Sequence, residues 1–240
     1  MPTYHVPLKR HEEVAQRTTA FYFKRPAEFQ FKPGQFLNLI LLDPPETDAE
    51  GNARSFSIAS APEEDDLMLT TRMRDTAFKR VLGQMSPGTE VKIAGPFGSF
   101  TLHRDESRPA VILTGGIGVT PFRSMVVSAA RNKLPHRLFL FYSNRRPEDA
   151  AFLDELQQLE KENPNYRFVA TMTGLQRSEQ AWNGKTGYIN REMLSEVISV
   201  LRAPIYYSAG PPEMVAAMRK LLEESAVSED DIRTEDFSGY

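Results

Sequence analysis

The stretch Val111-Ile-Leu-Thr-Gly-Gly-Ile-Gly-Val-Thr-Pro121 decides the expected fold. A short buried strand runs into three glycines, and Thr120 with Pro121 then opens a helix. Glycine lets the backbone turn tightly and approach a ligand closely, while Thr120 can cap the helix and proline lacks an N–H that would be unpaired there. The exposed amides and the helix dipole favour an anion such as a pyrophosphate. The alternative is a tight strand-to-helix turn that binds nothing.

Downstream of this turn the pattern alternates between apolar runs typical of strands and periodic segments typical of helices. The expected strands are Ala110–Thr114, Arg137–Tyr142, Arg167–Thr171 and Pro204–Ser208. The expected helices are Pro121–Arg131, Glu148–Glu162, Arg191–Val200 and Pro212–Glu223. Such alternation predicts crossover units and a parallel sheet, so we expect a Rossmann-like α/β domain over residues 106–240.

Upstream of the turn the chain consists of short β-rich runs separated by Gly/Pro-containing turns. The expected strands are Thr18–Lys24, Gln35–Leu42, Arg54–Ala59, Asp66–Arg74 and Thr89–Gly95, with one embedded helix at Ala77–Met85. Short, closely spaced strands predict an antiparallel barrel or sandwich over residues 1–105. The polar stretch Arg104–Arg108 marks the expected domain boundary.

Composition excludes several classes of function. A net charge of −3 gives no electrostatic footprint for nucleic acid. The longest apolar run, Phe36–Leu42, is far shorter than the ~20 residues that cross a bilayer, and no basic and apolar leader is visible at the start, so we expect a soluble, cytoplasmic protein.

The chain has no cysteine, which excludes disulfides, thiolate-bound zinc and cysteine-ligated iron–sulfur clusters. Any electron carrier must therefore be an organic cofactor. The four histidines are scattered, three of them beside Arg, Lys or Pro in expected loops, so we expect no metal site.

The glycine run resembles the pyridine-nucleotide turn of the ferredoxin–NADP reductase superfamily, in which Gly-Gly-x-Gly-[Ile/Val]-Thr-Pro recurs. Three further segments match that family in order: Arg54-Ser-Phe-Ser57, Gly95-Pro-Phe-Gly-Ser-Phe100 and Ala209-Gly-Pro-Pro-Glu-Met214. The resemblance covers nearly the whole chain. It implies an N-terminal FAD-binding β-barrel and a C-terminal NAD(P)-binding domain, with NAD(P)H docked across the domain interface.

The resemblance also implies roles for the first of these segments. Arg54 would pair with the FAD pyrophosphate, to which a guanidinium fork is suited. Phe56 would pack on the isoalloxazine ring or ribityl chain, and Ser57 would hydrogen-bond flavin N5. An extended strand places Arg54 and Phe56 on one side and Ser55 and Ser57 on the other. The alternative is an ordinary amphipathic strand with one exposed arginine.

Further flavin contacts follow from the same resemblance. They comprise Thr71, Arg72 and a looser match at the start of the embedded helix, Ala77, Phe78 and Lys79. The segment Gly95–Phe100 is expected to be structural. At the chain end, Glu235 would relay a proton near N5, and Tyr240 or Phe237 would cover the flavin ring. The alternative there is a frayed tail.

On the nicotinamide side the resemblance implies two groups of residues. They are Thr114, Gly115, Gly116, Gly118, Val119, Thr120 and Pro121 in the turn, and Ala209, Gly210, Pro211 and Met214 after the last expected strand. Relatives carry cysteine where this chain has Ala209, a difference that bears on the efficiency or geometry of transfer. Hydride transfer needs no protein nucleophile, so the chemistry remains possible.

The residues after the second strand of a dinucleotide fold face the ribose 2′ position. Here that strand is followed by Ser143, Arg145 and Arg146, with no acid before Glu148. Arginine and serine suit a phosphate, which favours NADPH over NADH. The alternative is a solvated basic loop.

The expected function is therefore transfer of a hydride from NAD(P)H to bound FAD. Because the chain can hold no cluster, the electron acceptor must be a separate protein: a ferredoxin, a flavodoxin or an oxygenase component. The alternative is a non-catalytic flavin- or nucleotide-binding subunit that responds to redox state.

Overall fold

The structure is a computed structural model that describes residues 2–237. The chain divides into two compact units, which we call the barrel unit (residues 1–101 and 120–128) and the parallel-sheet unit (residues 102–119 and 129–240). Most of helix α2 (Thr120–Arg131) therefore groups with the barrel unit, although it directly follows the glycine turn in the chain.

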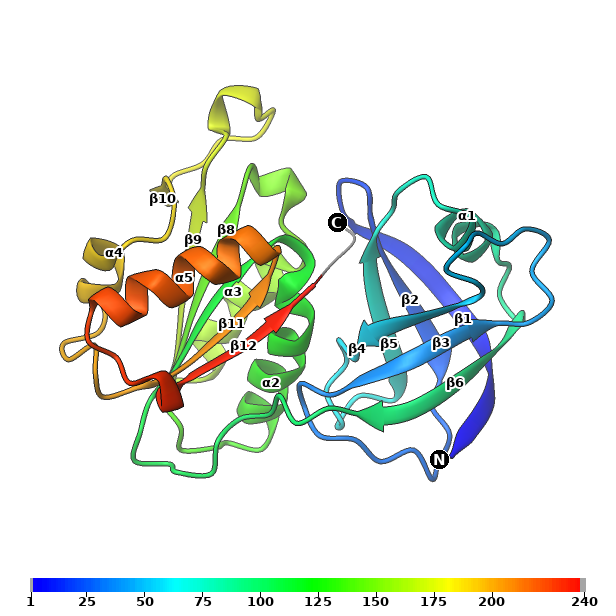
Figure 1. The fold of residues 1–240 in the computed structure, drawn as a ribbon, viewed down its shortest axis with the longest axis horizontal. Helices are drawn as coiled ribbons and strands as arrows, with labels where there is room; N and C mark the ends of the chain where they lie inside the picture. Colours follow the sequence, from blue (N-terminus) through cyan, green and yellow to red (C-terminus); the bar gives the residue numbers. More distant parts are fainter. Residues whose placement is uncertain (1, 238–240) are drawn as a thin grey trace. The chain divides into compact units, whose positions relative to one another are not determined.

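Six antiparallel strands form the barrel unit in the order β4-β3-β6-β1-β2-β5 (Figure 1). They are β1 (Thr3–Ala15), β2 (Thr18–Lys24), β3 (Phe36–Leu41), β4 (Ala53–Ser57), β5 (Asp66–Arg72) and β6 (Glu90–Phe97). The two edge strands meet just after β4, where Ile58 forms a bridge with Leu69 and the Ala59 N–H donates to the Met68 carbonyl at 2.8 Å. This bridge closes the sheet and leaves no open edge at that point.

Alternating side chains fill the barrel. In β3, Leu37, Leu39 and Leu41 point inward and are buried, while the residues between them are half-buried. Helix α1 (Ala77–Gln84) adds Phe78 and Leu82 to the same core. The apolar face of this short helix is thus stabilised by burial against the strands.

Six parallel strands form the second unit in the order β10-β9-β8-β7-β11-β12 (Figure 1). They are β7 (Ala110–Gly115), β8 (Leu138–Asn144), β9 (Tyr166–Met172), β10 (Lys185–Thr186), β11 (Ile205–Gly210) and β12 (Ile232–Asp236). The helices of this unit are α3 (Leu153–Glu162), α4 (Arg191–Ser195) and α5 (Pro212–Glu224), with 3₁₀ turns η1 (Gly116–Val119), η2 (Pro147–Asp149), η3 (Leu175–Arg177) and η4 (Glu229–Asp231). Every residue of β7 and β11 is buried, as expected for central strands covered on both faces.

The expected fold class, an antiparallel barrel followed by a parallel α/β sheet, is confirmed. Three strands were not predicted: β1, β10 and β12. One of the three histidines expected in loops, His11, lies in β1, so that expectation was wrong for it. The expected helix Glu148–Glu162 is divided, because Phe152 adopts a left-handed conformation with φ of 61° before α3 begins.

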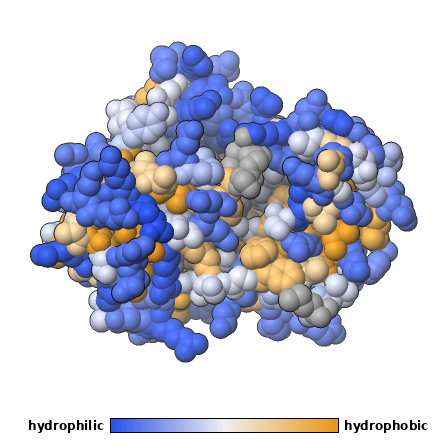
Figure 2. Space-filling view, in the orientation of Figure 1, coloured by the Kyte–Doolittle hydropathy of each residue, from blue (hydrophilic) through white to orange (hydrophobic). Residues whose placement is uncertain are grey.

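The expected helix Arg191–Val200 is also shorter than predicted, since α4 ends at Ser195. No helix in the described residues is long and apolar enough to span a membrane. Hydrophilic residues cover most of the face shown in Figure 2. Among the described large hydrophobic side chains only Leu42, Tyr188 and Val200 are exposed, so the apolar residues mainly build the two cores.

Candidate functional site

The glycine turn of the parallel-sheet unit is closed on one side and open on the other. A Cβ atom at Gly118 would lie 2.4 Å from the carbonyl oxygen of Ala209, and one at Gly115 would lie 2.5 Å from Sδ of Met214. Gly116, in contrast, has a φ of +55° and nothing within 4 Å of its Cβ position. The backbone therefore packs against β11 and α5 through two glycines and presents the third to open space.

Hydrogen bonds hold the turn in this position. The hydroxyl of Thr114 donates to the carbonyl of Ala209 at 2.7 Å, and the hydroxyl of Tyr142 donates to the carbonyl of Gly116 at 3.0 Å. Met214 lies in the first turn of α5, close to Gly115 and Gly210. The structure thus brings together predicted residues that are 95 positions apart in the sequence. Val119, Thr120 and Pro121, also predicted for this site, are buried.

This arrangement fits a dinucleotide. Backbone amides in a glycine turn attract a pyrophosphate, and the missing Cβ at Gly116 leaves room for it. Gly210, the last residue of β11, has a φ of +150°, lies beside the same turn and also lacks a side chain. The site needs no metal or nucleophile to hold such a ligand.

The two arginines proposed for the ribose phosphate follow β8 directly and differ in their contacts. Arg146 is engaged: its Nε donates to Asp149 at 2.8 Å, and its Nη1 lies 3.4 Å from Glu148. Arg145 is exposed, and its side chain makes no hydrogen bond or ion pair within the described residues. Ser143 is half-buried beside them. Arg145 is therefore the cation available to an incoming phosphate.

Glu235 lies in β12 opposite Ala209 of β11. Burial raises the pKa of the Glu235 carboxyl, and its Oε2 atom has no hydrogen-bond partner among the described residues. A carboxyl group with a raised pKa and an oxygen that makes no hydrogen bond is suited to exchanging a proton. The strand that carries Glu235 is an ordered part of the sheet, and Phe237 after it donates its N–H to the Gly210 carbonyl at 3.1 Å. Tyr240, the other residue expected over the flavin ring, lies outside the described residues.

The predicted flavin strand, β4, has the alternation that its sequence implies. Arg54 pairs with Leu39 and Phe56 with Leu37, so both face the barrel interior, and Phe56 is buried in the barrel core. The Arg54 guanidinium lies over the ring of Phe78, 5.0 Å from its centroid. Arg54 is therefore anchored beside the start of α1.

The two serines of β4 differ in exposure. Ser55 is exposed, and its hydroxyl donates to the amide oxygen of Asn38 at 2.7 Å. Ser57, at the end of the strand, is buried. The two hydroxyls lie on one side of the strand, and Ser57 is the one that is withdrawn from solvent.

Positive charge gathers at the start of α1. Thr76 caps this helix by accepting from the Lys79 N–H, and the Lys79 ammonium donates to the Arg72 carbonyl at 2.9 Å. Burial, followed by repulsion from Arg74 and Arg54, lowers the pKa of Lys79 to about 8. Thr71 is buried in β5 beside Arg72, and Ala77 and Phe78 are buried in the first turn of α1. A half-buried ammonium close to two arginines favours an anion, so this donor set fits the pyrophosphate of FAD.

Sequence reasoning missed the acidic side chains around Arg54. Asp48 lies 2.7 Å from its Nη2 atom and Glu50 lies 3.0 Å from its Nε atom. The available signal was the run Glu46-Thr-Asp-Ala-Glu50, which places three carboxylates shortly before Arg54 in the chain.

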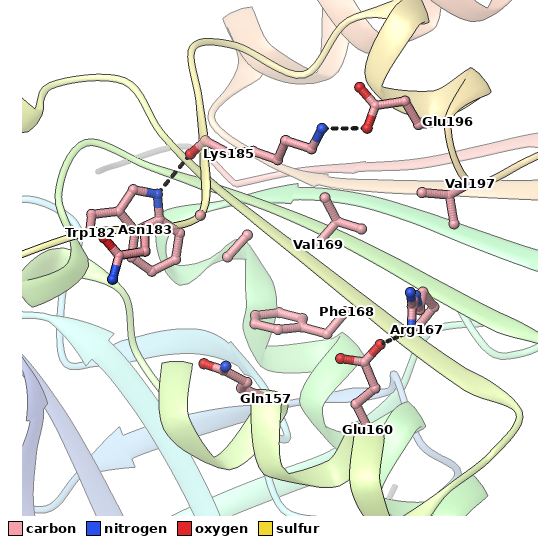
Figure 3. A pocket seen from close by; sticks show the side chains of 12 residues that line it. Gln157, Glu160, Arg167, Phe168, Val169, Trp182, Asn183, Lys185, Glu196 and Val197 are labelled. Atoms are coloured by element: carbon pink, nitrogen blue, oxygen red, sulfur yellow. Dashed lines mark hydrogen bonds and ion pairs between the residues drawn. The ribbon is translucent and has the colours of Figure 1, made fainter.

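A separate cavity of about 680 Å³ lies along the outer side of β9 (Figure 3). Within it Arg167 pairs with Glu160 at 2.9 Å, Lys185 pairs with Glu196, and the indole N–H of Trp182 donates to the Lys185 carbonyl. The charges are thus balanced within the cavity, and none of the residues predicted for cofactor binding lines it.

Comparison with known proteins places the two units in two described domain families. A model of the oxidoreductase FAD-binding domain matches residues 5–102, and one of the oxidoreductase NAD-binding domain matches residues 112–220. The chain is therefore a two-domain flavin and nicotinamide oxidoreductase. It belongs to the ferredoxin–NADP reductase superfamily of FAD-containing NAD(P)H oxidoreductases.

Individual relatives agree with this assignment. The chain is 32% identical over 224 residues to the reductase component of propane 2-monooxygenase from Mycolicibacterium smegmatis, covering 89% of this chain and 61% of the relative. It is also 32% identical over 201 residues to one of the subunits of the Na(+)-translocating NADH-quinone reductase of Actinobacillus succinogenes, covering 78% of this chain and 49% of the relative. The chain thus spans about half to three fifths of the length of these relatives.

Solved structures share the fold. The Amycolatopsis cytochrome P450 reductase GcoB superposes with a TM-score of 0.82 at 22% identity, over 98% of this chain and 70% of that one. A ferredoxin NADP+ reductase from Neisseria gonorrhoeae with bound FAD and NADP has a TM-score of 0.81 at 21% identity, and 98% of each chain is covered.

Proposed function

We propose that this chain takes a hydride from NADPH, holds the two electrons on FAD and passes them to a separate acceptor protein. The observation that carries this proposal is that a single chain combines a cationic site at Arg54 and α1 with a glycine-lined site at Gly116. Each offers the donors that a dinucleotide pyrophosphate needs. In this proposal residues 1–105 form the FAD domain and residues 106–240 the NAD(P) domain.

FAD, when bound, supplies an acceptor for two electrons that can release them one at a time. The residues of the chain bind and orient the two cofactors. Arg54, Lys79 and the first amides of α1 would hold the flavin pyrophosphate, and Ser57 would hydrogen-bond N5. The turn at Gly116 would hold the nicotinamide dinucleotide, with Met214 and Ala209 beside it.

Glu235 would hold the proton that accompanies electron transfer. Support comes from its raised pKa and its unpaired Oε2 atom, which leave the carboxyl able to exchange a proton. Ala209, which lies opposite Glu235 in the sheet, has no thiol. In this proposal hydride transfer therefore depends on how the chain holds the nicotinamide and flavin rings.

NADPH is the nucleotide that we favour, because Arg145 is an unpaired cation at the end of β8 within the described part of the chain. NADH is the second candidate. Two observations favour it. Glu148 and Asp149 neutralise Arg146, and several relatives are named as subunits of an NADH-quinone reductase.

The acceptor that we propose is an oxygenase component, a ferredoxin or a flavodoxin. The propane 2-monooxygenase reductase component is a relative whose name describes such a role. The competing proposal is a binding module without turnover, since the family resemblance implies a cysteine where this chain has Ala209.

An anaerobic titration distinguishes these proposals. The purified chain is expected to be yellow, and NADPH should bleach the flavin absorbance within seconds, faster than NADH does. Addition of an oxidised ferredoxin, flavodoxin or oxygenase component should restore the colour. Binding of NADPH without bleaching would instead support the module, and a chain that takes up no flavin would exclude both.

A further inference from the structure

The loop between β3 and β4 places three carboxylates against the cations of the proposed flavin site. Glu46 pairs with Arg80 of α1, whereas Asp48 and Glu50 both pair with Arg54. All three belong to a segment of five residues. The loop is therefore attached by ion pairs both to α1 and to β4.

Asp48 occupies a particular position within this loop. Its carboxylate accepts from Nη2 of Arg54 at 2.7 Å and is also hydrogen-bonded by the backbone of Phe78, the second residue of α1. These contacts, the one with Arg54 foremost, hold the pKa of Asp48 below its usual range. A guanidinium and an amide at a helix start are the two donor types that a pyrophosphate uses. An anion from the chain itself thus already lies between them.

The remaining donors of Arg54 are also engaged by the loop. Its Nε atom lies 3.0 Å from the Glu50 carboxylate, and its Nη1 atom donates to the carbonyls of Gly51 and Ala53 at 2.8 Å each. A guanidinium has five N–H groups, and these contacts together with Asp48 use most of them. An incoming pyrophosphate can therefore reach Arg54 in a bidentate manner only by displacing a carboxylate.

We propose that Asp48 is an internal anion that occupies part of the FAD pyrophosphate site and thereby sets how tightly the chain retains the dinucleotide flavin. This inference rests on the proposed function, because it takes FAD as the ligand of this site. Asp48 acts on the cofactor through Arg54 and the start of α1, as a positioning residue. The loop must release Asp48 when the pyrophosphate binds, so its charge opposes FAD and leaves a flavin without phosphate unaffected.

Flavin affinity tests this inference without any need for turnover. The full chain is freed of flavin, and its binding of FAD and of riboflavin is measured by quenching of flavin fluorescence. Replacing Asp48 by asparagine (Asp48→Asn) keeps the shape of the side chain but removes its charge. FAD should bind roughly three- to tenfold more tightly to Asp48→Asn, the size expected for removing one solvent-exposed like charge close to a phosphate. Riboflavin, which has no phosphate, should bind both proteins equally.

Two further variants serve as controls. Asp65→Asn removes an exposed aspartate elsewhere in the barrel unit and should leave FAD affinity unchanged. Asp48→Glu restores the carboxylate and should return FAD affinity to within about twofold of the parent. Equal or weaker binding of FAD by Asp48→Asn would overturn the inference, because the carboxylate would then support Arg54 rather than compete for it. A parallel gain for riboflavin would overturn it as well.

A different result would contradict the proposed function. If the parent and Asp48→Asn both bind neither FAD nor riboflavin while remaining folded by circular dichroism, the flavin assignment is wrong, and the inference falls with it. If the parent binds FAD and Asp48→Asn does so with the same affinity, the flavin assignment stands and only the role of Asp48 is rejected.

Discussion

Alanine substitutions at three glycines separate the packing role of the nucleotide turn from its binding role. Gly118→Ala would place Cβ 2.4 Å from the carbonyl oxygen of Ala209, about 1 Å closer than the 3.4 Å of ordinary contact. The atoms that this Cβ would meet are backbone atoms of Ala209 and Gly210, so no side-chain rotation relieves the contact. Overpacking of this kind costs about 3 kcal/mol. We expect the parallel-sheet unit to unfold roughly 10 °C lower than in the parent.

Gly116→Ala should affect nucleotide binding more than stability. Its Cβ would meet nothing within 4 Å, so the only structural cost is the left-handed backbone, φ +55°, at about 1–2 kcal/mol. The new methyl group would nevertheless fill the space that we assign to the nucleotide pyrophosphate. NADPH affinity should therefore fall at least about tenfold, a loss of roughly 1.4 kcal/mol of binding free energy.

Gly187→Ala is the matched control for backbone strain. Gly187 lies in the same unit, has a φ of +88° and also has nothing within 4 Å of its Cβ position. It should destabilise the unit about as much as Gly116→Ala while leaving NADPH affinity unchanged. Calorimetry and NADPH titration of the three variants measure both effects. Equal losses of NADPH affinity in Gly116→Ala and Gly187→Ala would refute the assignment of the open glycine to the ligand.

Three other predictions concern side chains. Arg54→Ala should reduce the FAD retained on purification more than tenfold with little change in NADPH affinity, and an FAD content equal to that of the parent would contradict its role. Arg145→Ala should raise the Michaelis constant for NADPH about tenfold but not that for NADH. Arg146→Ala should have a smaller effect, because Arg146 is hydrogen-bonded to Asp149. If neither variant changes the ratio of the Michaelis constants for NADPH and NADH, these arginines do not bind the 2′-phosphate. Burial raises the pKa of Glu235, so the folded state is disfavoured as pH rises from the unfolded toward the folded pKa of this group. Relative to the parent, Glu235→Gln should therefore gain thermal stability as the pH rises above 4.5, the ordinary pKa of a glutamate, and a difference independent of pH would show that the carboxyl is not perturbed.

The sequence predicts the parts of the fold that depend on apolar periodicity. Strands β7 and β11 are continuous buried runs, and their limits were predicted within two residues. Strand β1 was missed because its second half, Lys9–Glu13, is charged and exposed and has no alternating pattern. It is held instead by pairing with β2, where the hydroxyl of Tyr22 donates to Glu12 at 2.6 Å.

Strand β12 was missed for a related reason. Its sequence Ile232-Arg-Thr-Glu-Asp236 is mostly polar, and it becomes a strand only because β11 offers a free edge to pair with. Pairing of this kind connects residues far from any local signal, so propensity alone cannot show it. The strand bears on the proposed function because it carries Glu235, whose burial follows from this pairing and not from its neighbours in sequence.

The candidate site shows the same division between local and distant causes. The glycine turn could be predicted because an anion site built from backbone amides requires glycine and proline at fixed positions. The contacts of the two arginines after β8 could not, since Arg145 and Arg146 are neighbours in sequence and either could turn toward Asp149, whereas in the structure Arg146 does so. Arg54 follows the same rule, because a loop carboxylate competes for it. A motif therefore predicts which residue can bind a phosphate, whereas the structure adds which carboxylates already pair with that residue.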